Sequence, residues 1–178
     1  YLFFAQLYSA FVFSVDDAFI SLRYAEHLAQ GQGLTWNIGA APVEGYSNFL
    51  YVLLASIFIK INLPPLISLK LFSCLSLAAS VFVLYKISLL HLERSLAFIP
   101  SLLMLSYYGE IFWTVSGLET AFYQLLVLTT VYQLFQGMKT KEGSAFLLAG
   151  IINGLAGLTR PEAPMFMMIF SPCVLYIL

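Results

Sequence analysis

The sequence predicts an all-α protein: a multi-span bundle of transmembrane helices whose extracytoplasmic first loop carries an amphipathic interfacial helix. Two features of the composition predict this fold class. The 178 residues are 61% hydrophobic and only 10% charged, whereas soluble domains carry roughly 25% charged residues. Long apolar runs recur along the whole length, so we expect a single transmembrane domain over residues 1–178. The net charge of −1 argues against a nucleic-acid partner.

Both ends of the chain are apolar. Tyr1–Val15 forms the first predicted span, but a helix needs about 20 residues to cross the hydrocarbon core. The chain also stops inside an apolar run at Val174–Leu178. We therefore expect this sequence to be the amino-terminal part of a longer multi-span protein. Cys74 and Cys173 lie inside apolar runs and are interpreted as small core residues.

The longest polar interval of the chain, Asp16–Tyr46, follows the first span directly. A helical wheel over residues 17–30 separates a polar sector of about 100° from an apolar remainder. The polar sector consists of Arg23, Glu26, His27 and Gln30. This pattern predicts a helix that lies in the membrane interface with its apolar face toward the lipid. Glycines 31 and 33 should end the helix, and residues 34–45 should form a loop.

The rest of the chain alternates apolar runs with polar breaks. Ser47–Ile61 is about 15 residues long and contains Lys60, so it is predicted to be a re-entrant or interfacial helix that does not cross the membrane. The predicted later spans are Leu66–Leu90, Leu96–Tyr108, Ala121–Phe135, Ser144–Leu158 and a last one beginning with Ala163–Leu178. Gly150 and Gly154 have the spacing of close helix packing in lipid.

The basic residues predict the orientation of the spans. Lys86 and Arg94 follow one span, and Lys139 and Lys141 follow another two spans later. The positive-inside rule places both groups in the cytoplasm. The loop 16–46, the break at 117–120 and the break at 160–162 are then all extracytoplasmic. All acidic residues except Glu93 and Glu142 fall on that outer side, where we expect the active site.

Asp16 and Asp17 are the first candidates for catalysis. They could simply cap the amphipathic helix. Alternatively, one of them is a general base at the place where a lipid-linked substrate meets a water-borne acceptor. If the helix extends back by one turn, Asp16 joins the face of Arg23 and Asp17 points away from it. We therefore predict Asp16 as the base and Asp17 as its support.

Arg160 and Glu119 are candidates for substrate binding. Arg160 could be a snorkelling anchor or a partner of Glu162, or it could neutralise a phosphate leaving group. Glu119 could interact with a helix dipole or contact the substrate. The full set of substrate-binding candidates is Arg23, Glu44, Tyr46, Glu119, Arg160 and Glu162.

The sequence contains no set of His, Cys and carboxylate residues at metal-ligand spacing and no glycine-rich phosphate loop or nucleophile motif. We therefore predict no cofactor. Participation of a divalent metal is left open.

Four motifs resemble a known family. They are D-D-A-F-I-S-L-R-Y-A-E-H-L-A-Q-G-Q-G-L at 16–34, V-E-G-Y-S-N-F-L at 43–50, G-L-E-T at 117–120 and G-L-T-R-P-E at 157–162. Together they resemble the GT-C class of membrane glycosyltransferases, and within it the branch of the terminal arabinofuranosyltransferases of the mycobacterial cell wall. The first two motifs carry most of the specificity. The chain is rich in Phe, Ile and Lys rather than Ala and Arg, which argues against arabinose as the sugar.

The resemblance implies an inverting glycosyltransferase of the bacterial plasma (inner) membrane. It would move a sugar from a polyprenyl-phosphate donor to a glycan or glycolipid acceptor of the cell envelope, on the extracytoplasmic side. The family's acidic motif matches Asp16 and Asp17, and further spans and a carboxy-terminal extracytoplasmic domain would follow residue 178. The alternative from another class is a fragment of a transporter or flippase whose outward acids bind a substrate.

Overall fold

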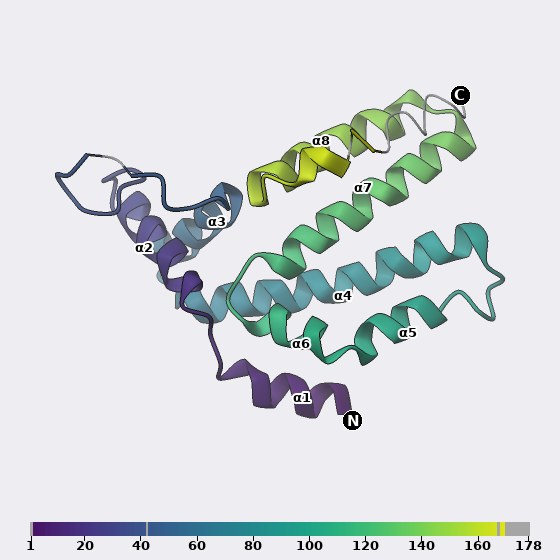
Figure 1. Cartoon of the computed structure of the whole chain (residues 1–178), viewed down its shortest axis with the longest axis horizontal. Coiled ribbons are helices and arrows are strands. Elements are labelled where there is room, and N and C mark those ends of the chain that lie inside the picture. Colours follow the sequence, from purple (N-terminus) through teal and green to yellow (C-terminus); the bar gives the residue numbers. More distant parts are fainter. Residues whose placement is uncertain (1, 42, 167, 170–178) are drawn as a thin grey trace.

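The computed structural model describes residues 2–41, 43–166 and 168–169 (Figure 1). Over these residues the protein is all-helical, as predicted, and the described part contains no strand. The helices are α1 (Leu2–Phe11), α2 (Asp17–Ala29), α3 (Phe49–Lys60), α4 (Pro65–His91), α5 (Ile99–Ser106), α6 (Tyr108–Val115), α7 (Thr120–Thr140) and α8 (Gly143–Thr159).

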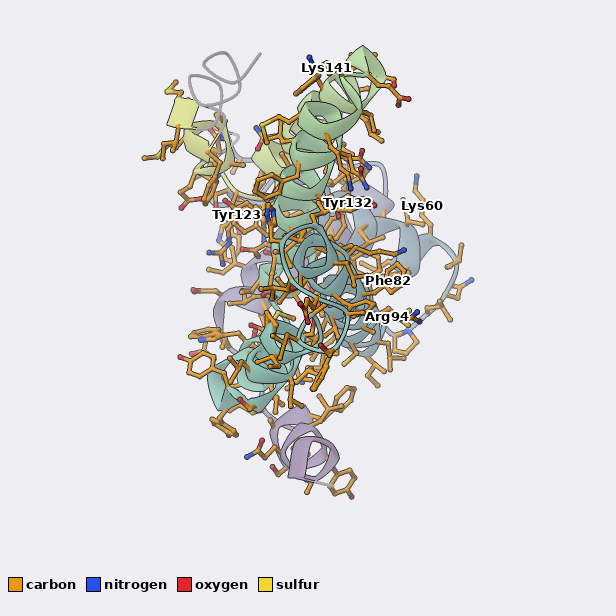
Figure 2. All side chains as sticks on the ribbon, turned by 90° about the vertical axis from the view of Figure 1, so that its right-hand side faces the viewer. Lys60, Phe82, Arg94, Tyr123, Tyr132 and Lys141 are labelled. Carbon is orange, nitrogen blue, oxygen red and sulfur yellow. The ribbon has the colours of Figure 1, made fainter. Side chains whose placement is uncertain are left out.

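The long helices run back and forth between two ends of the molecule. Helix α7 packs against both α4 and α8, and α5 and α6 return along α4 (Figure 1). Helices α2 and α3 pack against each other at the end where α4 begins. The loops that carry Arg94 and Lys141 lie at the opposite end, which faces the viewer in Figure 2. The acidic motifs and the basic loops therefore occupy opposite ends of the bundle.

Helix α4 has the length and composition of a membrane span. Its 27 residues extend about 40 Å, against about 30 Å for the hydrocarbon core. Helices α6 and α7 pass the same criteria only as a pair, and they are bent by 115° at the break between them. The described residues thus contain one or two candidate spans, and the predicted multi-span bundle is not confirmed.

Two predicted helices agree closely with the structure. The helix predicted over 17–30 is α2, and Gly31 and Gly33 follow it with positive φ angles of 79° and 78°. The helix predicted within 47–61 is α3, which has 12 residues and is only about 18 Å long.

The region 96–120 differs from the prediction. The span predicted over 96–108 corresponds to the shorter helix α5, which ends before extended backbone at Tyr107 (φ −81°, ψ 114°), and the unpredicted helix α6 follows where a polar break was expected. The predicted break at Gly109 and Glu110 lies inside α6, because an acid in the first turn of a helix interacts favourably with its dipole. The sharp bend of 115° lies further along the chain, at residues 116–119 between α6 and α7. Most of the span predicted over 163–178 lies outside the described residues.

The apolar face of α2 is covered by protein. Leu22, Tyr24 and Ala25 form one buried cluster with Tyr51 and Val52 of α3. The prediction had this face resting on lipid; the close packing of α3 on α2 replaces that contact. Gly150 and Gly154 of α8 also differ from their prediction. A Cβ atom at Gly150 or Gly154 would meet nothing within 4 Å, so neither makes a tight helix contact within the described part of the chain.

Candidate active site

The start of α2 and the turn before α7 meet at the end of the bundle that carries α2 and α3. The backbone N–H of Val15, just before α2, donates to the carbonyl of Ser116 at 3.0 Å. Gly117 adopts a φ of 93°, and a Cβ atom there would lie 3.0 Å from the Cβ of Ala18. Only glycine combines this backbone angle with such close approach. The turn before α7 is thereby held against the start of α2.

A cavity of about 390 Å³ opens at this junction. We call it the first cavity. It is lined by Asp17, Ile20 and Ser21 of α2, by Gly45, Tyr46, Ser47 and Asn48 before α3, by Leu118 and Glu119 before α7, and by Arg160, Pro161 and Glu162 after α8.

A chain of hydrogen bonds joins these segments beneath the cavity. The side-chain amide of Asn48 lies 2.9 Å from the hydroxyl of Ser21 and donates to Oε2 of Glu119 at 2.9 Å. The Nε of Arg160 donates to Oε1 of Glu119 at 2.8 Å. Side chains thus connect four parts of the sequence. The two most distant, Ser21 and Arg160, are 139 residues apart.

The ion pair between Glu119 and Arg160 is asymmetric in its burial. The Glu119 side chain is 8% exposed and the Arg160 side chain is 35% exposed. Both carboxylate oxygens of Glu119 are occupied, one by Arg160 and one by Asn48, so Glu119 is an anchor and not a free base. The guanidinium of Arg160 also reaches the hydroxyl of Thr120 at 3.4 Å and lies 5.7 Å from the ring centre of Tyr123. Arg160 also lines the first cavity.

Most of the predicted site residues come together in the first cavity. Asp17, Tyr46, Glu119, Arg160 and Glu162 all line it. Asp17 and Glu162 are exposed. Both extracytoplasmic breaks predicted from the sequence, at 117–120 and 160–162, therefore contribute to one cavity together with the first loop.

Asp16, Arg23 and Glu44 do not line the first cavity. Asp16 is exposed and makes no side-chain cap on α2. Arg23, which was predicted to share a helical face with Asp16, contacts the loop after α2 instead. Its guanidinium donates to the carbonyl of Trp36 at 2.8 Å and to Asn37 Oδ1 at 2.9 Å, and it stacks over the Trp36 ring. Arg23 thus fixes the loop after α2. Glu44 lines a neighbouring cavity.

Sequence reasoning missed Ser21 and Asn48. Asn48 directly precedes an apolar helix, where asparagine normally caps the helix through its side chain. Here the side chain makes no cap hydrogen bond and is directed to Glu119 instead. The available signal for Ser21 was a serine on the apolar side of the predicted helix, and the structure buries it. Within the described residues there is no group of three or more His, Cys, Asp or Glu side chains suited to hold a metal ion.

The chain matches no protein-family model, no curated protein and no solved structure. The resemblance to membrane glycosyltransferases therefore depends on the four motifs alone.

Proposed function

We propose that this chain belongs to a GT-C-type glycosyltransferase that moves a sugar from a polyprenyl-phosphate donor to a glycan or glycolipid acceptor. One observation carries the proposal. An exposed carboxylate, Asp17, and a partly exposed guanidinium, Arg160, line the same cavity at one end of an apolar helical bundle. A base for the acceptor and a cation for a phosphate are the two groups that such a transfer requires.

The proposed reaction is a single displacement. The acceptor hydroxyl oxygen attacks the anomeric carbon of the donor sugar, and the bond from that carbon to the phosphate oxygen breaks. The configuration at the anomeric carbon inverts. The hydroxyl proton passes to Asp17, and the polyprenyl phosphate leaves with the bonding electrons. A phosphate ester is already a good leaving group, so no acid is needed.

Asp17 suits the role of base better than Asp16, because it is the member of the pair that lines the cavity. Arg160 suits the leaving phosphate because Glu119 holds only its Nε in a close hydrogen bond. The remaining guanidinium donors can bind phosphate oxygens, and hydrogen bonds between charged groups are about twice as strong as neutral ones.

The position of the cavity agrees with a lipid-borne donor. It lies at the end of the bundle where α4 begins, opposite the loops of Arg94 and Lys141. If α4 spans the membrane with the basic loops in the cytoplasm, the cavity opens at the extracytoplasmic surface of the plasma membrane. A polyprenyl donor reaches that surface through the lipid, so no nucleotide-binding fold is required.

One observation favours a second candidate function. The carboxylates of Asp17, Glu119 and Glu162 outnumber the single guanidinium in the lining of the first cavity. Excess negative charge attracts a cation or an amine, which suits a transporter that binds its substrate from outside. The two candidates differ in outcome, because a transferase changes the covalent structure of its substrate and a transporter does not.

The test uses the full-length protein in proteoliposomes. A polyprenyl-phosphate sugar with a radiolabelled sugar is supplied in the lipid, together with a cell-envelope glycan acceptor and no nucleotide sugar, in parallel with Mg²⁺ and with EDTA. We expect the label to appear in the acceptor, and Arg160→Gln to abolish transfer. Translocation of the labelled donor between leaflets without transfer would instead identify a flippase.

A further inference from the structure

A second cavity, of about 700 Å³, lies beside the first. It is lined by Glu44, Gly45, Tyr46, Ser47, Phe49, Gly157, Leu158 and Pro161. Four of these residues, Gly45, Tyr46, Ser47 and Pro161, also line the first cavity. The two cavities are therefore neighbours that share a wall made by the segment before α3.

The shared wall is held in place from behind. The hydroxyl of Tyr24 donates to the carbonyl of Val43 at 2.7 Å and accepts from the N–H of Gly45 at 3.1 Å. Tyr24 itself is 1% exposed. A Cβ atom on residue 45 would lie 2.8 Å from the Tyr24 hydroxyl, so the backbone approaches that hydroxyl more closely than any other residue type allows.

The same tyrosine positions the ring of Tyr46. The two ring centres are 4.8 Å apart with an interplanar angle of 60°, a tilted arrangement that is favourable for aromatic pairs. Burial, the carboxylate of Glu44 and the nearby Tyr24 raise the pKa of the Tyr46 phenol. The phenol therefore stays protonated and can both donate and accept a hydrogen bond.

The lining of the second cavity is chemically selective. Tyr46 and Phe49 supply aromatic rings, and Glu44 and Ser47 supply a carboxylate and a hydroxyl. Among the described residues that line it there is neither lysine nor arginine, so a phosphate would meet the charge of Glu44 without compensation. An isoprenoid chain would cover these polar groups without offering them a hydrogen bond, which is unfavourable.

A neutral sugar satisfies all of these groups. Its hydroxyls can donate to the carboxylate, which accepts up to about four hydrogen bonds. Its C–H faces can pack on aromatic rings.

We propose that the second cavity binds the acceptor as a neutral glycan chain, with Glu44 and Tyr46 as the residues that recognise it. The inference rests on the proposed transferase function and assigns the donor's sugar phosphate to the first cavity. The shared wall at Tyr46 and Ser47 then brings the acceptor hydroxyl to the boundary of the cavity that Asp17 lines. Donor and acceptor would meet across this wall.

Binding is measured without donor, so that it does not depend on turnover. The probe is a neutral oligosaccharide fraction of the source cell's envelope glycan, freed of phosphate and labelled fluorescently at the reducing end. The protein is held in lipid nanodiscs. We expect saturable binding that weakens roughly tenfold in dissociation constant in Glu44→Gln and in Tyr46→Leu. Tyr46→Phe keeps the ring and should retain most of the affinity.

Glu26→Gln is the matched control, because Glu26 is an exposed carboxylate of α2 outside both cavities. Gly45→Ala provides a second variant that removes no recognising group but displaces the wall, and it should weaken binding as well. Unchanged affinity in both Glu44→Gln and Tyr46→Leu would overturn the assignment, as would the absence of saturable binding to the unmodified protein.

The binding measurement tests the glycan site whether or not the protein transfers sugar. Glycan binding that depends on Glu44 and Tyr46, in a protein that shows no transfer, supports the glycan site and overturns the transferase. If the protein transfers sugar, Glu44→Gln should raise the KM for the acceptor and leave the KM for the donor unchanged, because Glu44 lines the second cavity and not the first. Tyr46→Leu should raise the KM for the acceptor as well, but its effect on the donor KM does not discriminate between the cavities, because Tyr46 lines both. An increase confined to the donor KM in Glu44→Gln would place the donor lipid in the second cavity and overturn the inference.

Discussion

Asn48 donates a 2.9 Å hydrogen bond to the buried carboxylate of Glu119 across 71 residues of sequence. The same carboxylate receives Arg160 on its other oxygen, so the orientation of the guanidinium depends on an uncharged residue from the loop before α3. Through Ser21 the chain of hydrogen bonds extends to α2, the helix that carries Asp17. The proposed base and the proposed phosphate-binding cation are therefore positioned by one network.

The first prediction tests this network through Asn48→Ala. The change leaves one oxygen of Glu119 buried without a partner, which should cost about 1–3 kcal/mol. We expect a lower melting temperature in detergent and a higher KM for the donor, because Arg160 loses its fixed position. A double-mutant cycle with Glu119→Gln measures the coupling. If the two effects add without coupling, the hydrogen bond does not position Glu119.

A second prediction concerns Lys70, which is buried in α4 at 3% exposure. Its ammonium donates to the carbonyls of Phe11 and Phe13 at 2.6 and 2.7 Å, at the end of α1. We expect Lys70→Met to release the segment 11–15 that leads to Asp16 and Asp17, and to speed amide hydrogen exchange there. Lys60→Met, at the exposed end of α3, is the control. Equal exchange in both variants would show that Lys70 does not hold this segment.

A third prediction tests the topology. In a background with Cys74 and Cys173 changed to Ser, single cysteines replace the exposed residues Ala40, Glu162, Arg94 and Lys141. An impermeant thiol reagent applied to intact spheroplasts should label Ala40→Cys and Glu162→Cys and spare Arg94→Cys and Lys141→Cys. The reason is that the loop between α2 and α3, which carries Ala40, and the first cavity, which Glu162 lines, lie at one end of the bundle, and Arg94 and Lys141 lie at the other (Figures 1 and 2). Labelling of Ala40→Cys without Glu162→Cys would contradict the common face.

The sequence predicted the parts of the fold that depend on local pattern. Helix α2 has a clear polar sector and two glycines behind it, and α3 is short and closed by polar residues, so both could be located. Helix α6 was not predicted, because Gly109 and Glu110 indicated a break in the chain; the break lies two residues earlier, at Tyr107, and both residues belong to α6.

In the candidate site, too, local sequence pattern did not predict the contacts between distant residues. Charged residues in polar breaks indicated Glu119, Arg160 and Glu162, and all three line one cavity. The helical wheel, however, treats α2 in isolation and placed Asp16 with Arg23. Tertiary contacts decide otherwise, because Arg23 binds the loop at Trp36 and the cavity forms on the side of Asp17. Asn48 was missed because its partner is distant in sequence.

The last prediction separates the carboxylates of the first cavity. Glu119 is occupied on both oxygens, which leaves Asp17 and Glu162 as the candidates for a base, and Asp17 alone belongs to the acidic motif of α2. Loss of a general base typically lowers the rate by 10²–10⁴-fold. We expect Asp17→Asn to reduce kcat by about that factor, with Asp16→Asn and Glu162→Gln costing less, at equal amounts of folded protein in proteoliposomes. A near-normal kcat in Asp17→Asn together with an inactive Asp16→Asn would return the role of base to Asp16, and full activity in all three variants would remove these carboxylates from the mechanism.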